Sequence, residues 1–150
     1  MTTSSPEQTR HFGACLGRNA VCGSIIALSG ELGSGKTCLT QGIAKGLDVP
    51  HTYTVTSPTF AIVNDYPARI KLHHIDLYRI MGASELEEIG LEEILAGDGV
   101  TVIEWADKFS EVLPSHRLDI AISVIDEQMR EFRLTAHGQN VITWTEKCVE

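Results

Sequence analysis

The sequence GELGSGKT at residues 30–37 decides the predicted fold. An apolar run at residues 25–28 precedes it, and residues 36–45 follow it with apolar side chains at helical spacing. The pattern GxxxxGK[ST] between a buried strand and a helix is typical of a loop whose backbone N–H groups surround a phosphate. In such a loop, Lys36 reaches the β- and γ-phosphates and the Thr37 hydroxyl binds Mg²⁺. The sequence therefore predicts a nucleotide site at this loop.

The expected nucleotide is ATP, because a guanine-reading NKxD motif is absent. The nearest stretch, Ala106-Asp107-Lys108, has these residues in the wrong order. ATP is thus favoured over GTP by the lack of a guanine reader, and Mg²⁺ is expected to accompany it.

A hydrolytic site of this kind also needs an acid at the end of a neighbouring strand, where it holds the metal shell or positions the attacking water. Two residues qualify. Asp76 follows the strand-like residues 72–75, and Glu104 follows residues 100–103. The second run is the more uniformly apolar, which favours Glu104 as the acid on the metal side. The sequence leaves the division of labour between the two acids open.

Residues 56–60, Thr-Ser-Pro-Thr-Phe, lie between the helix after the loop and the next strand. Two interpretations are equally supported: a switch in which a threonine of this segment senses the γ-phosphate, and an ordinary hydroxyl-rich turn. Trp105 has two interpretations as well. It is either a core side chain or, because it follows Glu104, a part of the site.

The remaining pattern predicts an α/β chain, because helices and strands alternate early and strands cluster late. We expect a P-loop NTPase-like three-layer fold with a mixed central sheet and a C-terminal antiparallel hairpin, in a single domain spanning residues 1–150. Gly46 is expected to cap the helix that follows the loop. The other expected elements are a helix at 6–18 with Ser5 as N-cap, a loop at 54–59, a hairpin of 60–66 and 70–77, an acidic helix at 84–95 with a break at Gly90, a strand at 100–103 ending at Glu104, and a hairpin of 118–124 and 132–136.

Composition points to a globular protein of the cytoplasm. The chain is 43% hydrophobic and 21% charged, and its net charge of -8 disfavours direct binding of phosphate backbones, so contact with nucleic acid is expected through a partner. Residues 1–11 show no secretory signal, and no run is apolar enough to span a membrane.

The 4 cysteines form no CxxC pair, and are expected to be free thiols in a reducing compartment. A zinc site is not expected, because the histidines do not lie at ligand spacing from the cysteines. His73 and His74 are adjacent and would point to opposite faces of a strand.

Taken in order, five motifs resemble the TsaE family, the bacterial ATPases of threonylcarbamoyl-adenosine tRNA modification. The resemblance covers residues 9–114. The motifs are GELGSGKT, TSPTF, HIDLYR, ELEEIGLEE and VIEWADK, with Leu113-Pro114 beyond the last.

This resemblance implies a role for each matching residue. The phosphates would be wrapped by Gly33, Ser34, Gly35, Lys36, Thr37 and Cys38, and Mg²⁺ would be ligated by Thr37 and Glu104. Asp76 matches an acid needed for activity, Thr59 and Trp105 match switch or partner-sensing positions, and Thr9 matches a residue near the base. Cys38 departs from the family, which usually has a hydroxyl there; a backbone N–H contact would survive the change. The resemblance also implies the partners TsaD and TsaB, with tRNA reached only through that complex, and ATP hydrolysis that is slow alone.

Two other functions compete with this one. A small-molecule kinase needs a lid with clustered arginines, whereas the arginines here are dispersed and none lies between Arg79 and Arg117. Arg79, near Asp76, is the one arginine close in sequence to an expected site residue. The second alternative is a binding module in which ATP orders residues 56–60 and hydrolysis is irrelevant.

Overall fold

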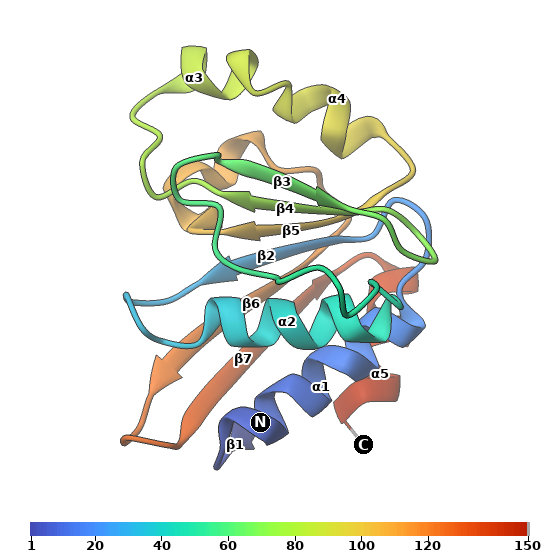
Figure 1. Cartoon of the computed structure of the whole chain (residues 1–150), viewed down its shortest axis with the longest axis vertical. Coiled ribbons are helices and arrows are strands. Elements are labelled where there is room, and N and C mark those ends of the chain that lie inside the picture. Colours follow the sequence, from blue (N-terminus) through green and yellow to red (C-terminus); the bar gives the residue numbers. More distant parts are fainter. Residues whose placement is uncertain (150) are drawn as a thin grey trace.

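The computed structural model describes residues 1–149 and is built on one mixed sheet (Figure 1). Its strands are β1 (Thr2–Thr3), β2 (Ile25–Ser29), β3 (Val63–Tyr66), β4 (Leu72–Asp76), β5 (Val100–Glu104), β6 (Arg117–Val124) and β7 (Arg130–His137). They lie in the order β1-β7-β6-β2-β5-β4-β3. The central pairs β6–β2, β2–β5 and β5–β4 are parallel, and the outer pairs are antiparallel.

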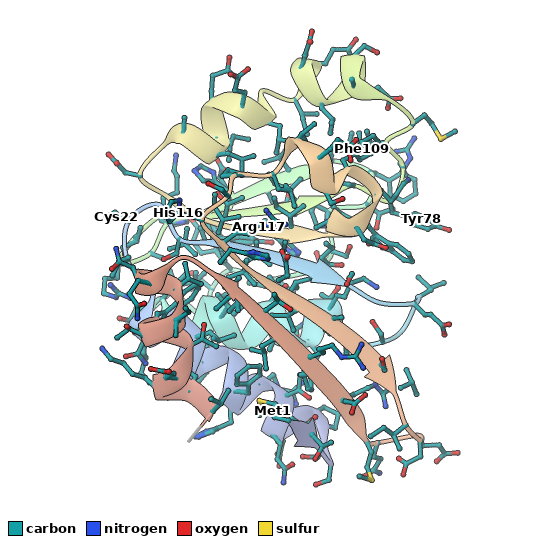
Figure 2. All side chains as sticks on the ribbon, turned by 180° about the vertical axis from the view of Figure 1, so that it is seen from behind. Met1, Cys22, Tyr78, Phe109, His116 and Arg117 are labelled. Carbon is teal, nitrogen blue, oxygen red and sulfur yellow. The ribbon has the colours of Figure 1, made fainter. Side chains whose placement is uncertain are left out.

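Helices cover both faces of this sheet. They are α1 (Pro6–Asn19), α2 (Lys36–Gly46), α3 (Ala83–Glu88), α4 (Leu91–Ala96), the 3₁₀ helix η1 (Ala106–Val112) and α5 (Gln139–Val149). One face carries α1, α2 and α5, and the other carries α3, α4 and η1. Figure 2 shows η1, with Phe109, on the side away from α1 and α2. The three layers, the mixed sheet and the β6–β7 hairpin confirm the predicted fold class.

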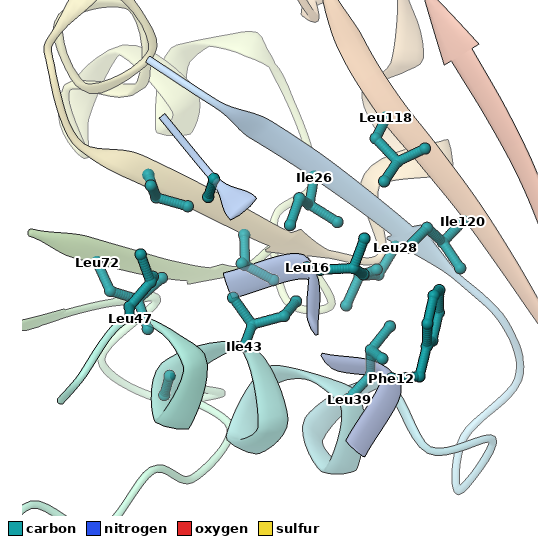
Figure 3. Packing of buried hydrophobic residues seen from close by; sticks show 14 of the residues in the cluster. Phe12, Leu16, Ile26, Leu28, Leu39, Ile43, Leu47, Leu72, Leu118 and Ile120 are labelled. Atoms are coloured by element: carbon teal, nitrogen blue, oxygen red, sulfur yellow. The ribbon is translucent and has the colours of Figure 1, made fainter. Parts of the chain in front are cut away.

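The central strand β2 is apolar throughout because both of its faces are covered. Ile26 and Leu28 pack with α1 and α2, whereas Ile25 and Ala27 pack in the opposite layer. Figure 3 shows the first of these clusters, in which side chains of the two helices point toward the strands. The parallel register then brings three strand ends together, since Leu28 of β2 and Asp76 of β4 both lie opposite Glu104 of β5. The loop after β2 and both predicted acids therefore meet at one edge of the sheet.

The helices α1 and α2 approach each other closely along four glycines. A Cβ atom at Gly17 would overlap the carbonyl oxygen of Ile43, and one at Gly46 would overlap that of Ala14. Gly13 and Gly42 have equally close backbone neighbours on the opposite helix. The predicted C-cap role of Gly46 is wrong: the helix continues through it, and the cap residue is Leu47 in a right-handed conformation. Gly46 is needed for the close approach of the helices instead.

We expect Gly17→Ala to lower the free energy of unfolding by about 1–3 kcal/mol, the usual effect of overpacking a tight interface. The loss should appear although alanine is intrinsically the better helix former. Urea unfolding followed by circular dichroism measures it. Gly82→Ala is the matched control, because nothing lies within 4 Å of its Cβ position and its φ of −164° is ordinary extended backbone. A Gly17→Ala protein as stable as the wild type would contradict this account of the helix pair.

Two predicted elements are shorter or divided in the structure. The strand expected at residues 60–66 begins at Val63, because Ile62 has a φ of 67° and the preceding residues form a turn. The strand expected at residues 70–77 is confined to Leu72–Asp76. The break predicted at Gly90 is confirmed: its φ of 71° separates α3 from α4. The predicted N-cap is also confirmed, since the Ser5 side chain accepts a hydrogen bond from the Gln8 backbone N–H.

Three elements of the structure, β1, η1 and α5, were not predicted from the sequence. The indole Nε1 of Trp144 in α5 donates a hydrogen bond to the Leu16 carbonyl of α1 at 3.0 Å, which fixes the last helix on the first. Within residues 1–149, no helix is long and apolar enough to cross a membrane.

Candidate functional site

The loop between β2 and α2 borders a cavity of about 240 Å³. Gly30, Gly33 and Gly35 have φ values of 148°, 78° and 109°, which side chains disfavour. Nothing lies within 4 Å of a Cβ position at Gly33 or Gly35, so their backbone faces open space. The cavity is lined by Leu32, Gly33, Ser34, Gly35, Lys36, Thr37, Cys38, Ser57, Asp76, Glu104 and Trp105. The structure thus brings together most of the residues singled out from the sequence.

Lys36 is buried against the loop that contains it, with 5% of its surface exposed. Its ammonium donates hydrogen bonds to the carbonyl oxygens of Gly30 at 2.6 Å and Glu31 at 2.9 Å. Burial lowers the pKa of Lys36, and nearby carboxylates, Glu104 first, act in the opposite direction. A phosphate that reaches this ammonium would replace the loop carbonyls as its acceptors.

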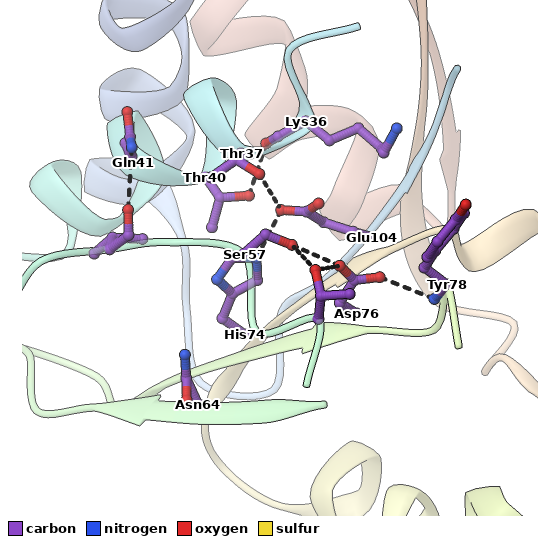
Figure 4. Close-up of polar contacts among 12 residues, drawn as sticks. Lys36, Thr37, Thr40, Gln41, Ser57, Asn64, His74, Asp76, Tyr78 and Glu104 are labelled. Carbon is purple, nitrogen blue, oxygen red and sulfur yellow. Dashed lines mark hydrogen bonds and ion pairs between the residues drawn. The ribbon is translucent and has the colours of Figure 1, made fainter. Parts of the chain in front are cut away.

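Glu104 lies at the end of β5 and is 2% exposed (Figure 4). Its Oε1 accepts a hydrogen bond from the Thr37 hydroxyl at 3.0 Å and lies 2.8 Å from Nε2 of His74. A hydroxyl and a carboxylate are the hard oxygen ligands that Mg²⁺ prefers, together with water and phosphate oxygens. The pair formed by Thr37 and Glu104 therefore fits a magnesium ion by its donor chemistry.

Asp76 binds the loop at residues 56–60. Its Oδ2 accepts a hydrogen bond from the Ser57 hydroxyl at 2.5 Å and another from the Thr59 hydroxyl at 3.3 Å. Its Oδ1 accepts from the backbone N–H of Tyr78 at 2.9 Å. Thr59 does not line the cavity, but it is connected to the cavity through Asp76. A movement of the loop at residues 56–60 would therefore displace the Asp76 carboxylate, and a movement of Asp76 would displace the loop.

Trp105 is held in an unusual backbone conformation beside Lys36. Its φ of 60° lies in the left-handed region, which is uncommon for residues other than glycine and often marks functional sites. The Lys36 ammonium lies 4.1 Å from the centre of the indole ring, within the range of a cation–π contact. The Tyr78 ring also lies beside the indole, with centroids 5.0 Å apart. Trp105 thereby connects the lysine to the segment that follows Asp76.

Thr9 and Cys38 lie at the edge of this arrangement. Thr9 is buried in α1, where its hydroxyl bonds that of Thr3 at 2.8 Å, and it does not line the cavity. The Cys38 thiol donates to the Pro6 carbonyl and accepts from Arg10, with S···O and N···S distances of 3.5 and 3.6 Å. Burial raises the pKa of Cys38, and the Arg10 charge opposes that rise. The proposed contacts of Thr9 with the base and of Cys38 with phosphate stay predictions.

Three residues at the site were missed. Ser57 and His74 bind the two acids, and Arg130 of β7 donates from Nε to the Ser34 carbonyl at 3.0 Å. Arg130 is 96 residues from Ser34, so no local pattern could reveal the contact. His74 could have been found, because alternate residues of a strand share a face and it lies two positions before Asp76. As expected, its neighbour His73 points elsewhere and bonds Asp65 at 2.7 Å.

Comparisons with known proteins show which family the chain belongs to. The family model described as threonylcarbamoyl adenosine biosynthesis protein TsaE matches residues 3–132. A Bacillus subtilis protein named tRNA threonylcarbamoyladenosine biosynthesis protein TsaE is 39% identical over 91% of this chain and 84% of its own length. A Treponema pallidum protein with the same name is 36% identical over 85% of this chain and 93% of its own length.

A solved structure shows the same architecture. The crystal structure of Bacillus subtilis YdiB superposes with a TM-score of 0.84 and 33% sequence identity, covering 99% of this chain and 91% of that one. The strand–loop–helix unit around Lys36 gives this chain the fold of a P-loop NTPase. The chain belongs to the TsaE family of threonylcarbamoyl adenosine biosynthesis proteins.

Proposed function

We propose that this protein is an ATPase of tRNA threonylcarbamoyladenosine modification that works in the cytoplasm with TsaD and TsaB. The observation that carries the proposal is the Thr37–Glu104 hydrogen bond beside the glycine loop and Lys36. The hydrogen bond supports the proposal because phosphoryl-group chemistry requires metal ligands next to a loop that binds phosphate. The names of the relatives supply the pathway.

In this proposal, the residues of the cavity have separate roles in binding phosphate, binding metal and orienting water. The backbone N–H groups of residues 33–38 surround the phosphates, and Lys36 neutralises the β- and γ-phosphates. Thr37 and Glu104 would hold Mg²⁺, which stabilises negative charge on the phosphates. Asp76 orients the attacking water and fixes the loop at residues 56–60, so that the state of the nucleotide reaches the loop and a bound partner.

The direct test measures MgATP binding and hydrolysis by the purified chain, and then compares ATP with a non-hydrolysable analogue in a tRNA modification assay. We expect modification to require ATP. Full modification with the analogue would favour the nucleotide-gated binding module, which the bonds between Asp76 and the loop also allow. The kinase alternative is disfavoured because, within residues 1–149, Lys36 is the one cationic side chain lining the cavity.

Glu104→Ala and Asp76→Ala should differ in their dependence on magnesium. We expect Glu104→Ala to weaken the Mg²⁺-dependent part of nucleotide binding at least about tenfold, because a metal ligand is lost. Asp76→Ala should leave the Mg²⁺-dependent part of nucleotide binding unchanged, because the Asp76 carboxylate bonds the loop at residues 56–60 and Tyr78 and not Thr37 or Glu104. Each variant is titrated with a fluorescent ADP analogue, once in Mg²⁺ and once in EDTA, and the difference in affinity gives the Mg²⁺-dependent part. The reverse order would show that the roles of the two acids are exchanged.

A further inference from the structure

The His74 imidazole is fully buried, yet only one of its two nitrogens has a partner. Nε2 lies 2.8 Å from Oε1 of Glu104, whereas Nδ1 has no hydrogen-bond partner among residues 1–149. A carboxylate can only accept a hydrogen bond, so Nε2 is the nitrogen that donates. The single polar contact of this buried ring is therefore with the proposed metal ligand.

The sheet itself sets this contact. His74 lies opposite Val102 in the parallel register of β4 and β5, and Asp76 lies opposite Glu104. His74 and Asp76 share the face of β4 that is directed toward α2, as Val102 and Glu104 do on β5. Figure 4 shows the imidazole next to the Glu104 carboxylate, with Thr37 on the carboxylate's other side. The histidine thus contacts the carboxylate from β4, whereas the threonine contacts it from the first turn of α2.

The unpaired Nδ1 argues against a purely structural role. A buried polar atom without a partner costs free energy, which an apolar side chain of similar volume would avoid. Leu72 and Ile75 fill buried positions on the same strand with apolar side chains. What the histidine adds at this position is the hydrogen bond to Glu104.

We propose that His74 is a positioning residue for the metal: its Nε2–H holds Oε1 of Glu104 in the orientation that meets the Thr37 hydroxyl, ready for Mg²⁺. This inference rests on the proposed function, since it assigns a support to the proposed ligand. Carboxylates that bind metals are generally hydrogen-bonded in this way, and loss of such a partner typically costs about 10–100-fold in metal affinity.

The test uses two amides that place their N–H groups differently. The amide nitrogen of Gln can occupy the place of Nε2, whereas that of Asn corresponds to Nδ1. We expect His74→Asn to raise the Mg²⁺ concentration for half-maximal stimulation of ADP binding about 10–100-fold, with ADP affinity in EDTA unchanged. His74→Gln should stay within about threefold of the wild type, and His73→Gln, next along the strand, is the matched control. Should His74→Asn fail to fold in a urea titration, His74→Leu takes its place.

A second measurement separates positioning from general packing. In a Glu104→Ala background, His74→Asn should cause no further loss of Mg²⁺ dependence, because the histidine acts only through that carboxylate. An additional loss there, or equal losses for His74→Asn and His74→Gln, would overturn the inference. A wild-type chain that binds ADP equally with and without Mg²⁺ would overturn the proposed metal site itself, and this inference with it.

Discussion

Lys36→Ala should bind MgATP weakly and show no measurable turnover. Lys36 is the one cationic side chain that lines the cavity within residues 1–149, so nothing else there can neutralise the β- and γ-phosphates. A hydrogen bond to a charged group contributes about 1.5–3 kcal/mol, which corresponds to roughly 10–100-fold in affinity. The loss in turnover should be larger, because negative charge on the transferred group must be stabilised as the bond to it breaks.

The control for this prediction is Lys45→Ala, which removes an exposed lysine from the last turn of the same helix. Both variants are compared with the wild type in a phosphate-release assay and in a urea titration. The titration is needed because the Lys36 ammonium also bonds the Gly30 and Glu31 carbonyls, so its removal can loosen the loop. Wild-type turnover by a folded Lys36→Ala protein would refute the assignment of the phosphate-binding loop.

The features that the sequence predicted well depend on neighbours along the chain. The strand, loop and helix around Lys36 are contiguous, and a left-handed glycine conformation recurs at each position where the motif has a glycine. Asp76 and Glu104 could be brought to one cavity because each ends a strand, and the ends of parallel strands meet at one edge of a sheet. Local pattern thus predicted most of the residues that line the cavity.

The features that local sequence pattern did not predict depend on contacts between segments that are distant in the chain. Arg130 reaches Ser34 only because β7 pairs with β6, which in turn lies beside β2. The role of Gly46 could not be seen without Ala14 packed against it, so the glycine resembled an ordinary helix cap. The last helix was missed because it is fixed by a distant contact, the hydrogen bond from the Trp144 indole to the Leu16 carbonyl of α1.

Partner proteins should accelerate ATP hydrolysis strongly. The arginines that approach the loop already have other contacts: Arg130 bonds backbone carbonyls, Arg10 bonds Cys38, and Arg79 lies over the Phe60 ring at 5.1 Å. Within residues 1–149, therefore, no arginine lines the cavity beside Lys36. An arginine supplied by a partner can be worth about 10³–10⁵ in the rate of phosphoryl transfer.

The same contacts suggest how a partner would act. Ser57 and Thr59 bond Asp76, so a protein docked on residues 56–60 would also fix an acid of the cavity. Exposed Phe60 lies at the end of that segment, where a partner can contact it. Docking would then add a cation and order the loop in one step.

The most direct test of this account is ATP turnover by the purified chain alone and during titration with TsaD and TsaB. We expect slow hydrolysis that rises steeply and saturates as the complex forms, with no rise for Lys36→Ala under the same conditions. Fast hydrolysis by the chain alone, unchanged when TsaD and TsaB are added, would show that the site is complete in itself and would contradict the account.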